Sequence, residues 1–321
     1  MTLVAIEEHW MLPDLAAALG ATPQPDESLL LNDHGDTAER LTDLAEGRLA
    51  VMDAQGVDVA ILSLTPPGTQ ALAPAAAVRL SRAANDTAAE AVRRHPTRFR
   101  FLSSLPLASP EHAADELRRA ADLGAVGAMV YGRSGALPLD DPALEDVLAT
   151  AAALHQPVFL HPQIPPDALR AAAYRGFEPL VELGLATFGW GWHVEAATAA
   201  LRLILRGTFD RHPDLRVVLG HWGELLLFWL DRADSLARIA GLRRSVSEYV
   251  REHFWITASG MLNPALLDHV RTVTTPDRLL FSTDYPFQQP SREEITAFLQ
   301  HVGDGEREAF TSGNASRLFR L

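Results

Sequence analysis

The chain has 321 residues, of which 47% are hydrophobic and 21% are charged, so it holds enough apolar material for one large core. Its formal net charge of −13 argues against a general affinity for nucleic acid or for an anionic membrane. It has neither cysteine nor lysine. That excludes disulfides, thiolate metal sites, cysteine nucleophiles, lysine Schiff bases, a P-loop lysine and a carboxylated-lysine metal bridge.

Short apolar segments rich in β-branched residues alternate with longer amphipathic segments along the chain. The predicted strands are, in chain order, Val4–His9, Val59–Leu64, Phe99–Leu105, Gly127–Tyr131, Pro157–His161, Leu215–His221, Phe254–Ser259 and Arg278–Thr283. The predicted helices are Asp36–Gln55, Pro74–Arg94, Pro110–Leu123, Pro142–Leu154, Val194–Arg206, Glu224–Ala240, Pro264–Val273, Ser291–His301 and about Glu306–Phe319. Eight strands, nearly all separated by helices, favour a closed (β/α)8 barrel, a TIM-type α/β fold.

The whole chain, residues 1–321, is expected to form a single domain, because α/β barrels of this length are routinely undivided. Two long segments relatively rich in Pro and Gly, near residues 20–36 and 163–192, are expected to lie above the mouth of the barrel. The alternative is a doubly wound open sheet. It would require a glycine-rich phosphate loop after an early strand, and neither GxGxxG nor GxxxxGKS/T is present.

The sequence also predicts where the protein works. No apolar run reaches the roughly 18 residues needed to span a membrane. The N-terminus lacks a basic region followed by an apolar stretch, and acidic residues begin at Glu7. We therefore expect a cytoplasmic protein without a signal peptide, whose partner is a small molecule rather than nucleic acid or a membrane.

Four predicted strands end in residues that can bind a divalent metal. In a barrel of this type, functional side chains come from the carboxyl ends of the strands. There the sequence places the pair Glu7 and His9, then His161, His221 and Asp284. Imidazole nitrogen and carboxylate oxygen are ligands of such ions. A lone histidine after a strand is more often a packing residue, but four such ends in one chain favour a metal site.

The spacing in the first strand supports a shared ion. Side chains alternate between the two faces of a strand, so Glu7 and His9 point the same way and Glu8 points the opposite way. Among the other histidines, His193 lies near the mouth and is a candidate for substrate contact. The remaining ones are interpreted as surface or packing residues, or as lying at the barrel's bottom: His34, His95, His112, His155, His212, His253, His269 and His301.

Five motifs give the chain a resemblance to a known family. They are Ala5-Ile6-Glu7-Glu8-His9, Phe159-Leu160-His161-Pro162, Gly220-His221-Trp222-Gly223-Glu224, Phe281-Ser282-Thr283-Asp284-Tyr285-Pro286-Phe287 and Gly313-Asn314-Ala315-Ser316-Arg317-Leu318-Phe319. In this order and spacing they resemble the metal-dependent decarboxylases of the amidohydrolase superfamily. That group includes γ-resorcylate, 5-carboxyvanillate and aminocarboxymuconate-semialdehyde decarboxylases. The resemblance spans nearly the whole chain and implies a TIM-type barrel.

The resemblance also implies a ligand set and an assembly. His221 and Glu224 are expected beside a single divalent ion, zinc or manganese, whose ligands are Glu7, His9, His161 and Asp284. Members are usually homodimers or homotetramers, and Arg232 matches a position from which an arginine can reach the neighbouring subunit's active site. The sequence departs from its relatives at the mouth. Gln163 stands where an arginine is expected, and residues 132–142 form a shorter segment.

The implied reaction is the non-oxidative decarboxylation of a small aromatic acid that carries a hydroxyl group ortho to its carboxylate. The metal chelates the substrate, Asp284 donates a proton to the ring carbon, and His221 with Glu224 sets the protonation state of Asp284. Aromatic side chains are expected to line the pocket for a flat substrate, with ordinary packing as the alternative for each: Trp10, Trp190, Trp192, Trp222 and Phe287.

Two other functions remain open at this point. A metal-dependent hydrolase would use the same ion to activate a water molecule, with Asp284 as general base, against an amide, a lactone or a C–C bond of a vinylogous acid. Release of CO2 from hydroxybenzoates would distinguish a decarboxylase from it. A barrel whose site has decayed into a binding module is disfavoured, because the ligand set is complete.

Overall fold

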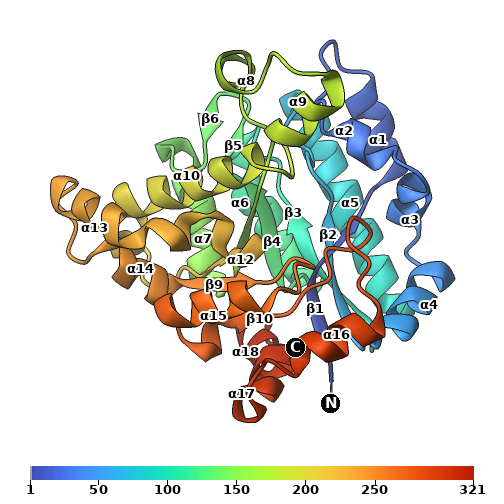
Figure 1. Ribbon diagram of the computed structural model, residues 1–321. Coiled ribbons are helices and arrows are strands. Elements are labelled where there is room, and N and C mark those ends of the chain that lie inside the picture. Colours follow the sequence, from blue (N-terminus) through green and yellow to red (C-terminus); the bar gives the residue numbers. More distant parts are fainter. Residues whose placement is uncertain (1) are drawn as a thin grey trace.

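The computed structural model describes residues 2–321, and its centre is a parallel barrel of eight strands (Figure 1). Their order around the barrel is β1 (Val4–Trp10), β2 (Val59–Leu64), β3 (Phe99–Ser104), β4 (Gly127–Tyr131), β7 (Val158–His161), β8 (Val217–Leu219), β9 (Phe254–Thr257) and β10 (Leu279–Leu280). The Ile6 N–H donates to the Phe281 carbonyl at 3.1 Å, and the His9 N–H donates to the Tyr285 carbonyl at 2.7 Å. These bonds join the last strand to the first, which confirms the predicted barrel.

Helices follow the strands and cover the outside of the barrel (Figure 1). In the first half they are α1 (Pro13–Gly20), α2 (Leu29–Asn32), α3 (Thr37–Thr42), α4 (Glu46–Gln55), α5 (Pro74–Arg94), α6 (Pro110–Asp122) and α7 (Glu145–Leu154). In the second half they are α8 (Asp167–Ala173), α9 (Pro179–Ala186), α10 (Gly191–Leu205), α11 (Thr208–Arg211), α12 (His221–Glu224), α13 (Leu230–Ile239), α14 (Val246–His253), α15 (Pro264–Val273), α16 (Arg292–Leu299), α17 (Asp304–Glu308) and α18 (Asn314–Phe319). Within residues 2–321, none of these helices combines the length and apolarity needed to cross a membrane.

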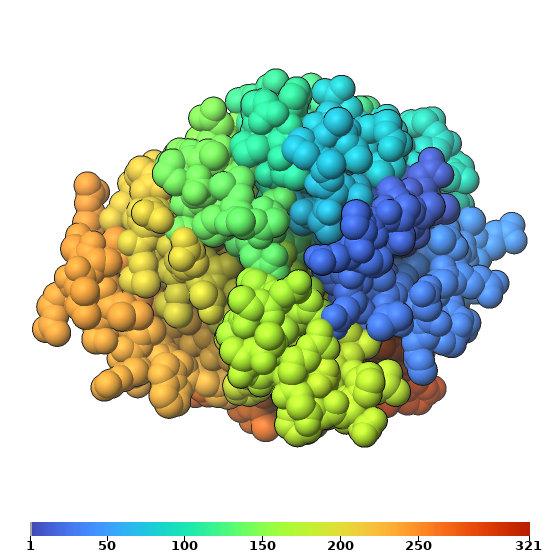
Figure 2. All heavy atoms as spheres, turned by 90° about the horizontal axis from the view of Figure 1, so that it is seen from above, coloured from blue at the N-terminus to red at the C-terminus, as the bar shows by residue number. Residues whose placement is uncertain are grey.

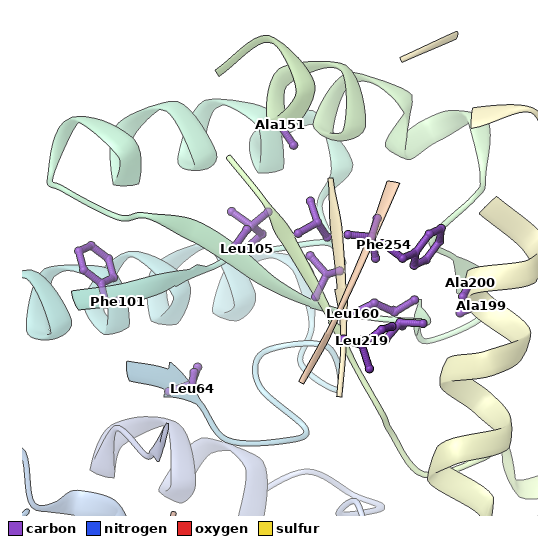
Figure 3. Packing of buried hydrophobic residues seen from close by; sticks show 14 of the residues in the cluster. Leu64, Phe101, Leu105, Ala151, Leu160, Ala199, Ala200, Leu219 and Phe254 are labelled. Carbon is purple, nitrogen blue, oxygen red and sulfur yellow. The ribbon is translucent and has the colours of Figure 1, made fainter. Parts of the chain in front are cut away.

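The core between barrel and helices is built from the outward side chains of the strands. Leu64, Leu160, Leu219 and Phe254 are buried there, and they belong to one cluster with helix residues such as Ala151 (Figure 3). Burying a leucine or phenylalanine side chain stabilises the fold by about 1.5–3 kcal/mol. Because parallel strands are covered on both faces, their sequences read as continuous apolar runs rather than alternating ones.

The inside of the barrel has an apolar lower layer. Every strand contributes to it, and the last helix, α18, packs against it from below through Ala315, Leu318 and Phe319. The strand residues are Val4, Ile6, Ile61, Leu102, Met129, Phe159, Val218, Trp255 and Leu280. Above this layer, toward the carboxyl ends of the strands, the interior carries polar side chains such as Glu7, His9 and His161.

A β-bulge in β1 changes which residues face inward. Ala5 pairs with Ala60 of β2, but Glu8 pairs with Leu62, so β1 holds one more residue than β2 over this stretch. Below the bulge Ile6 faces the interior, and above it the interior positions are Glu7 and His9. Without the extra residue, the alternation that buries Ile6 inside would send Glu7 outward.

Several predicted helices are interrupted. The helix predicted over residues 36–55 is split into α3 and α4, because the Asp43 carboxylate accepts the N–H groups of Ala45 at 2.7 Å and Arg48 at 2.9 Å. The helix predicted over 224–240 begins only at Leu230, after a 3-10 turn. A π-helical turn at residues 309–313 divides the last predicted helix into α17 and α18. Helices α1, α2, α8, α9, α11, α12 and α14 and the hairpin β5 (Arg133–Ser134)–β6 (Leu137–Pro138) were not predicted.

Residues 164–190, which we call the lid, contain α8 and α9 and lie over the mouth of the barrel (Figures 1 and 2). Ion pairs join the lid to the segment near residues 20–36. Arg170 lies 2.7 Å from Glu27, and Arg175 lies 2.8 Å from the other oxygen of the same carboxylate. The two segments expected above the mouth are thus in contact with each other.

Candidate active site

Three ligand-type side chains meet inside the upper end of the barrel. Glu7 and His9 come from the end of β1 and His161 from the end of β7; one ligand atom from each lies within 4.8 Å of the others, and all three side chains are buried. The Glu7 Oε1 lies 3.5 Å from the His161 Nε2 and 3.9 Å from the His9 Nε2. Asp284, which follows β10, places its Oδ1 3.1 Å from the His9 Nε2. Barrel closure brings the first and last strand ends together here.

The unsatisfied atoms of this cluster fit a cation. Glu7 Oε1 and His9 Nε2 are buried without any hydrogen-bond partner among the described residues. The His161 Nδ1–H donates to the Pro162 carbonyl at 2.8 Å, so its Nε2 presents a lone pair toward Glu7. Buried acceptors without donors cost about 1–3 kcal/mol each, and a divalent ion between them would remove that penalty.

Burial controls the charges in the cluster. It raises the pKa of Glu7 to about 8, against the lowering effect of His221, and it raises the pKa of Asp284 to about 7 in the same way. Burial also lowers the pKa of His9 to about 3 and that of His161 well below its usual value. Neutral imidazoles and carboxylates that are costly to ionise unaided form a donor set suited to a positive ion.

His221 and Glu224 form a second group beside the first. The His221 Nδ1 lies 2.8 Å from the Glu224 Oε1, and His193 approaches the other oxygen of that carboxylate, Oε2, at 2.7 Å. Burial alone would lower the pKa of His221, but Glu224, then Glu7 and Asp284, raise it to about 10. Burial alone would raise the pKa of Glu224, but His221 and His193 lower it to about 2. This group is therefore a charged, hydrogen-bonded chain.

The backbone at these strand ends is strained. Non-glycine residues with positive φ include His221 at 46°, Glu224 at 55°, Ser259 at 45° and Asp284 at 60°. Such conformations cost of order 1–3 kcal/mol each and cluster at functional sites. Gly220 is required by close approach, because a Cβ there would lie 2.8 Å from Ser259 Oγ and 3.1 Å from Glu224 Oε1.

Two of the predicted aromatic contacts lie beside the cluster. The Phe287 ring packs edge-on against His9, with centroids 5.6 Å apart. Trp192 lies 6.3 Å from His161 between ring centroids and is buried against the lid residues Ile164, Tyr174 and Ala186. The Trp192 Nε1–H is buried and has no partner among residues 2–321.

The other predicted contacts are not brought to the cluster within this chain. Trp10 lies on the outward face of β1, in the core between barrel and helices. Trp222 is fully buried there as well; its Nε1–H donates to the Met261 carbonyl at 2.7 Å, and its ring packs against Phe298. Trp190 is half exposed at the start of α10, and Arg232 is exposed on α13. For Trp10 and Trp222 the packing alternative is the one observed.

Some site residues were missed by sequence reasoning. Ser259 donates a hydrogen bond to Glu7 Oε2 and accepts the His221 N–H at 2.8 Å, while Ser63 lies 3.3 Å from His9 Nδ1. Ser63 and Ser259 lie at the carboxyl ends of β2 and β9, where functional side chains of a barrel are found, so the sequence could have indicated both. Gln163, which stands where an arginine was expected, places its amide against Arg133, with the amide oxygen 3.1 Å from the Arg133 Nε. Arg133 therefore supplies a guanidinium group near this position.

Comparison with known proteins agrees with this fold and site. A sequence model of the family described as amidohydrolase matches residues 9–321, and the chain belongs to that family. A γ-resorcylate decarboxylase from Rhizobium sp. (strain MTP-10005) is 35% identical over 334 residues, which cover 99% of this chain and 98% of the relative.

Solved structures give the same grouping. A 5-carboxyvanillate decarboxylase from Sphingomonas paucimobilis is 33% identical with a TM-score of 0.91, over 100% of this chain and 99% of that one. A dihydroxybenzoic acid decarboxylase from Polaromonas sp. JS666, with bound manganese and the inhibitor 2-nitroresorcinol, is 33% identical with a TM-score of 0.87, over 100% and 97%. These three relatives are thus decarboxylases of γ-resorcylate, 5-carboxyvanillate and dihydroxybenzoic acid.

Proposed function

We propose that this protein is a metal-dependent decarboxylase of a small aromatic acid with a hydroxyl group ortho to its carboxylate. The observation that carries the proposal is the buried cluster of Glu7, His9 and His161, in which Glu7 Oε1 and His9 Nε2 have no hydrogen-bond partner among the described residues, with the Asp284 carboxyl 3.1 Å from His9. Full-length similarity to γ-resorcylate decarboxylases supports the substrate class.

We assign the divalent ion to Glu7, His9, His161 and Asp284, with manganese favoured over zinc by the bound metal of the Polaromonas structure. When bound, the ion would act as a Lewis acid and template for the substrate's oxygens.

The chain's own residues would then move the proton. The protonated Asp284 carboxyl donates its proton to the ring carbon that bears the carboxylate. The C–C bond breaks, its electron pair returns to the ring, CO2 leaves, and solvent restores the proton on Asp284. His221 is held through its Nδ1 by Glu224 at 2.8 Å, which directs its Nε2 away from that carboxylate. Trp192 and Phe287 would exclude water from one side of the substrate's aromatic ring.

The test is incubation of manganese-loaded protein with 2,6-dihydroxybenzoate and, separately, with amide and lactone substrates. We expect CO2 release and formation of resorcinol from the hydroxybenzoate, and no hydrolysis. Hydrolysis of an amide or lactone without CO2 release would overturn the proposal in favour of the hydrolase.

We also propose that the working unit is a homo-oligomer in which a second copy covers α13. That helix stands out at the side of the barrel (Figure 1), and its surroundings expose apolar side chains of Phe228, Trp229 and Ile239. Trp229 is 69% exposed, an unfavourable state for a large aromatic side chain in a free monomer. Arg232 lies on the same surface, next to Trp229. The predicted cytoplasmic location remains a prediction.

Trp229→Glu is expected to convert the oligomer into monomers, because it places a charge in the apolar contact. Light scattering after size-exclusion chromatography measures the mass. The control is Leu123→Glu, another exposed apolar position, which should keep the oligomeric mass. Arg232→Ala should keep the mass as well but raise the KM. A wild-type protein that is already monomeric would contradict the proposal.

A further inference from the structure

His193 connects two parts of the molecule that the reaction requires together. It lies in the first turn of α10, and both of its ring nitrogens are in hydrogen-bond contact. The Nδ1 lies 2.7 Å from the Glu224 Oε2, and the Nε2 lies 2.8 Å from the carbonyl oxygen of Phe188. The first partner belongs to the His221–Glu224 pair, and the second belongs to the lid.

Both His193 ring nitrogens contact oxygen atoms of the protein. The Phe188 carbonyl oxygen only accepts, so the His193 Nε2–H donates to it, while the Nδ1 contacts the Glu224 carboxyl group. The other Glu224 oxygen, Oε1, is 2.8 Å from the His221 Nδ1. The two histidines thus hold one carboxylate from both sides.

This arrangement excludes two other roles for His193. Both nitrogens are already in contact with protein oxygens, so neither is free to bind a metal, although His193, His221 and Glu224 lie close enough together to suggest a second ion. For the same reason neither nitrogen is free to contact a substrate. The substrate contact predicted from the sequence is replaced by a role within the protein.

The lid end of the connection is closely packed. Phe188 has a 62% exposed side chain, so its main chain rather than its ring is what α10 holds. The Gly189 N–H donates to the Gly184 carbonyl at 2.9 Å, and Gly191 approaches the Ala186 carbonyl so closely that a Cβ would collide with it. A lid displaced from the mouth would carry the Phe188 carbonyl away from His193 or pull His193 away from Glu224.

We propose that His193 is a positioning residue that couples closure of the lid to the orientation of the His221–Glu224 pair. With the lid closed, His193 is fixed by the Phe188 carbonyl and holds Glu224, which in turn holds His221 with its Nε2 free. With the lid open, Glu224 loses one of its two donors. As a result, His221 is held in the orientation needed for turnover only when the lid covers the mouth. The expected effect on turnover rests on the proposed function, whereas the coupling between lid and pair does not.

Two matched variants separate the two bonds. The amide nitrogen of asparagine lies near the position of Nδ1, and that of glutamine lies near the position of Nε2. His193→Asn therefore keeps the donor to Glu224 and loses the bond to the lid, whereas His193→Gln does the reverse. His193→Ala loses both. His301, which is exposed, supplies the controls His301→Asn and His301→Gln.

Turnover and lid mobility are measured on the manganese-loaded, full-length protein. His193→Gln is expected to lower kcat by about tenfold or more, since it removes a hydrogen bond to a charged group, while KM changes less than threefold. His193→Asn should lower kcat less than His193→Gln but accelerate amide hydrogen exchange in residues 179–190 by about tenfold. His193→Ala should show both effects, and the His301 controls neither.

Amide hydrogen exchange does not depend on activity, because it reports on the lid itself. Unchanged lid exchange in His193→Ala would overturn the coupling. If the wild type does not decarboxylate hydroxybenzoates, the proposed function fails, while the exchange result still decides the coupling.

Discussion

Asp284→Asn is expected to lower kcat for decarboxylation of 2,6-dihydroxybenzoate by about 10³-fold, within the usual range for loss of a general acid. The amide has the shape of the carboxyl group but no transferable proton. Since Asp284 is also an assigned ligand, kcat is measured in excess manganese, and bound metal is determined on the same sample. This separates loss of the proton from loss of the ion.

The matched control for this variant is Asp268→Asn. Asp268 lies on α15 with a 75% exposed side chain and pairs with Arg271 at 3.5 Å. The kcat of Asp268→Asn should equal that of the wild type. If the kcat of Asp284→Asn in excess manganese stayed within tenfold of the wild-type value, Asp284 would not be the proton donor.

Glu7→Gln and Glu8→Gln should have different effects although the two residues are adjacent: the first should abolish metal binding, and the second should lower the stability of the fold. Glu7→Gln removes the charge of an assigned ligand, so the protein should lose its metal and its activity. Metal should then no longer raise the thermal midpoint, whereas saturation of the wild type at 100 times Kd adds about 2.7 kcal/mol to the free energy of unfolding. Metal analysis and thermal unfolding with and without manganese measure both effects.

Glu8→Gln should keep the metal and lose stability instead. The Glu8 carboxylate accepts the Thr283 N–H at 3.0 Å and the Thr283 Oγ1–H at 2.6 Å on the outer face of β1. An amide can replace only one of these acceptors, which costs about 1–3 kcal/mol. A Glu7→Gln protein that manganese stabilises as much as the wild type would refute the ligand assignment.

The sequence alone was sufficient for the barrel and for the types of residue at its mouth. Parallel strands covered on both faces require apolar runs of about five residues separated by amphipathic helices, and this pattern survives in a single sequence. The boundaries of β2, α5 and β4 were predicted to the residue. The split of α3 from α4 was not, because it depends on one side chain, Asp43, capping the second helix.

The candidate site was predictable only in part. Strand-end residues such as Glu7, His161 and Asp284 are visible because the carboxyl ends of all barrel strands open on one face. The direction of an aromatic side chain is not visible in this way. Trp10 and Trp222 are close to site residues in sequence but are buried in the helix layer. For Trp10 the reason is that neighbouring positions on a strand point to opposite sides, whereas Trp222 lies in the turn α12, whose left-handed backbone the sequence pattern does not reveal.

The candidate metal site has two origins. The sequence by itself determined which strand ends carry imidazoles and carboxylates. It also showed that the order of these motifs resembles that of one family. The tertiary structure decided the geometry. The bulge in β1 lets Glu7 face inward after Ile6, closure of the barrel sets Asp284 3.1 Å from His9, and packing of α10 beside α12 brings His193 to Glu224. Each depends on register or on contacts between distant segments, which local pattern does not encode.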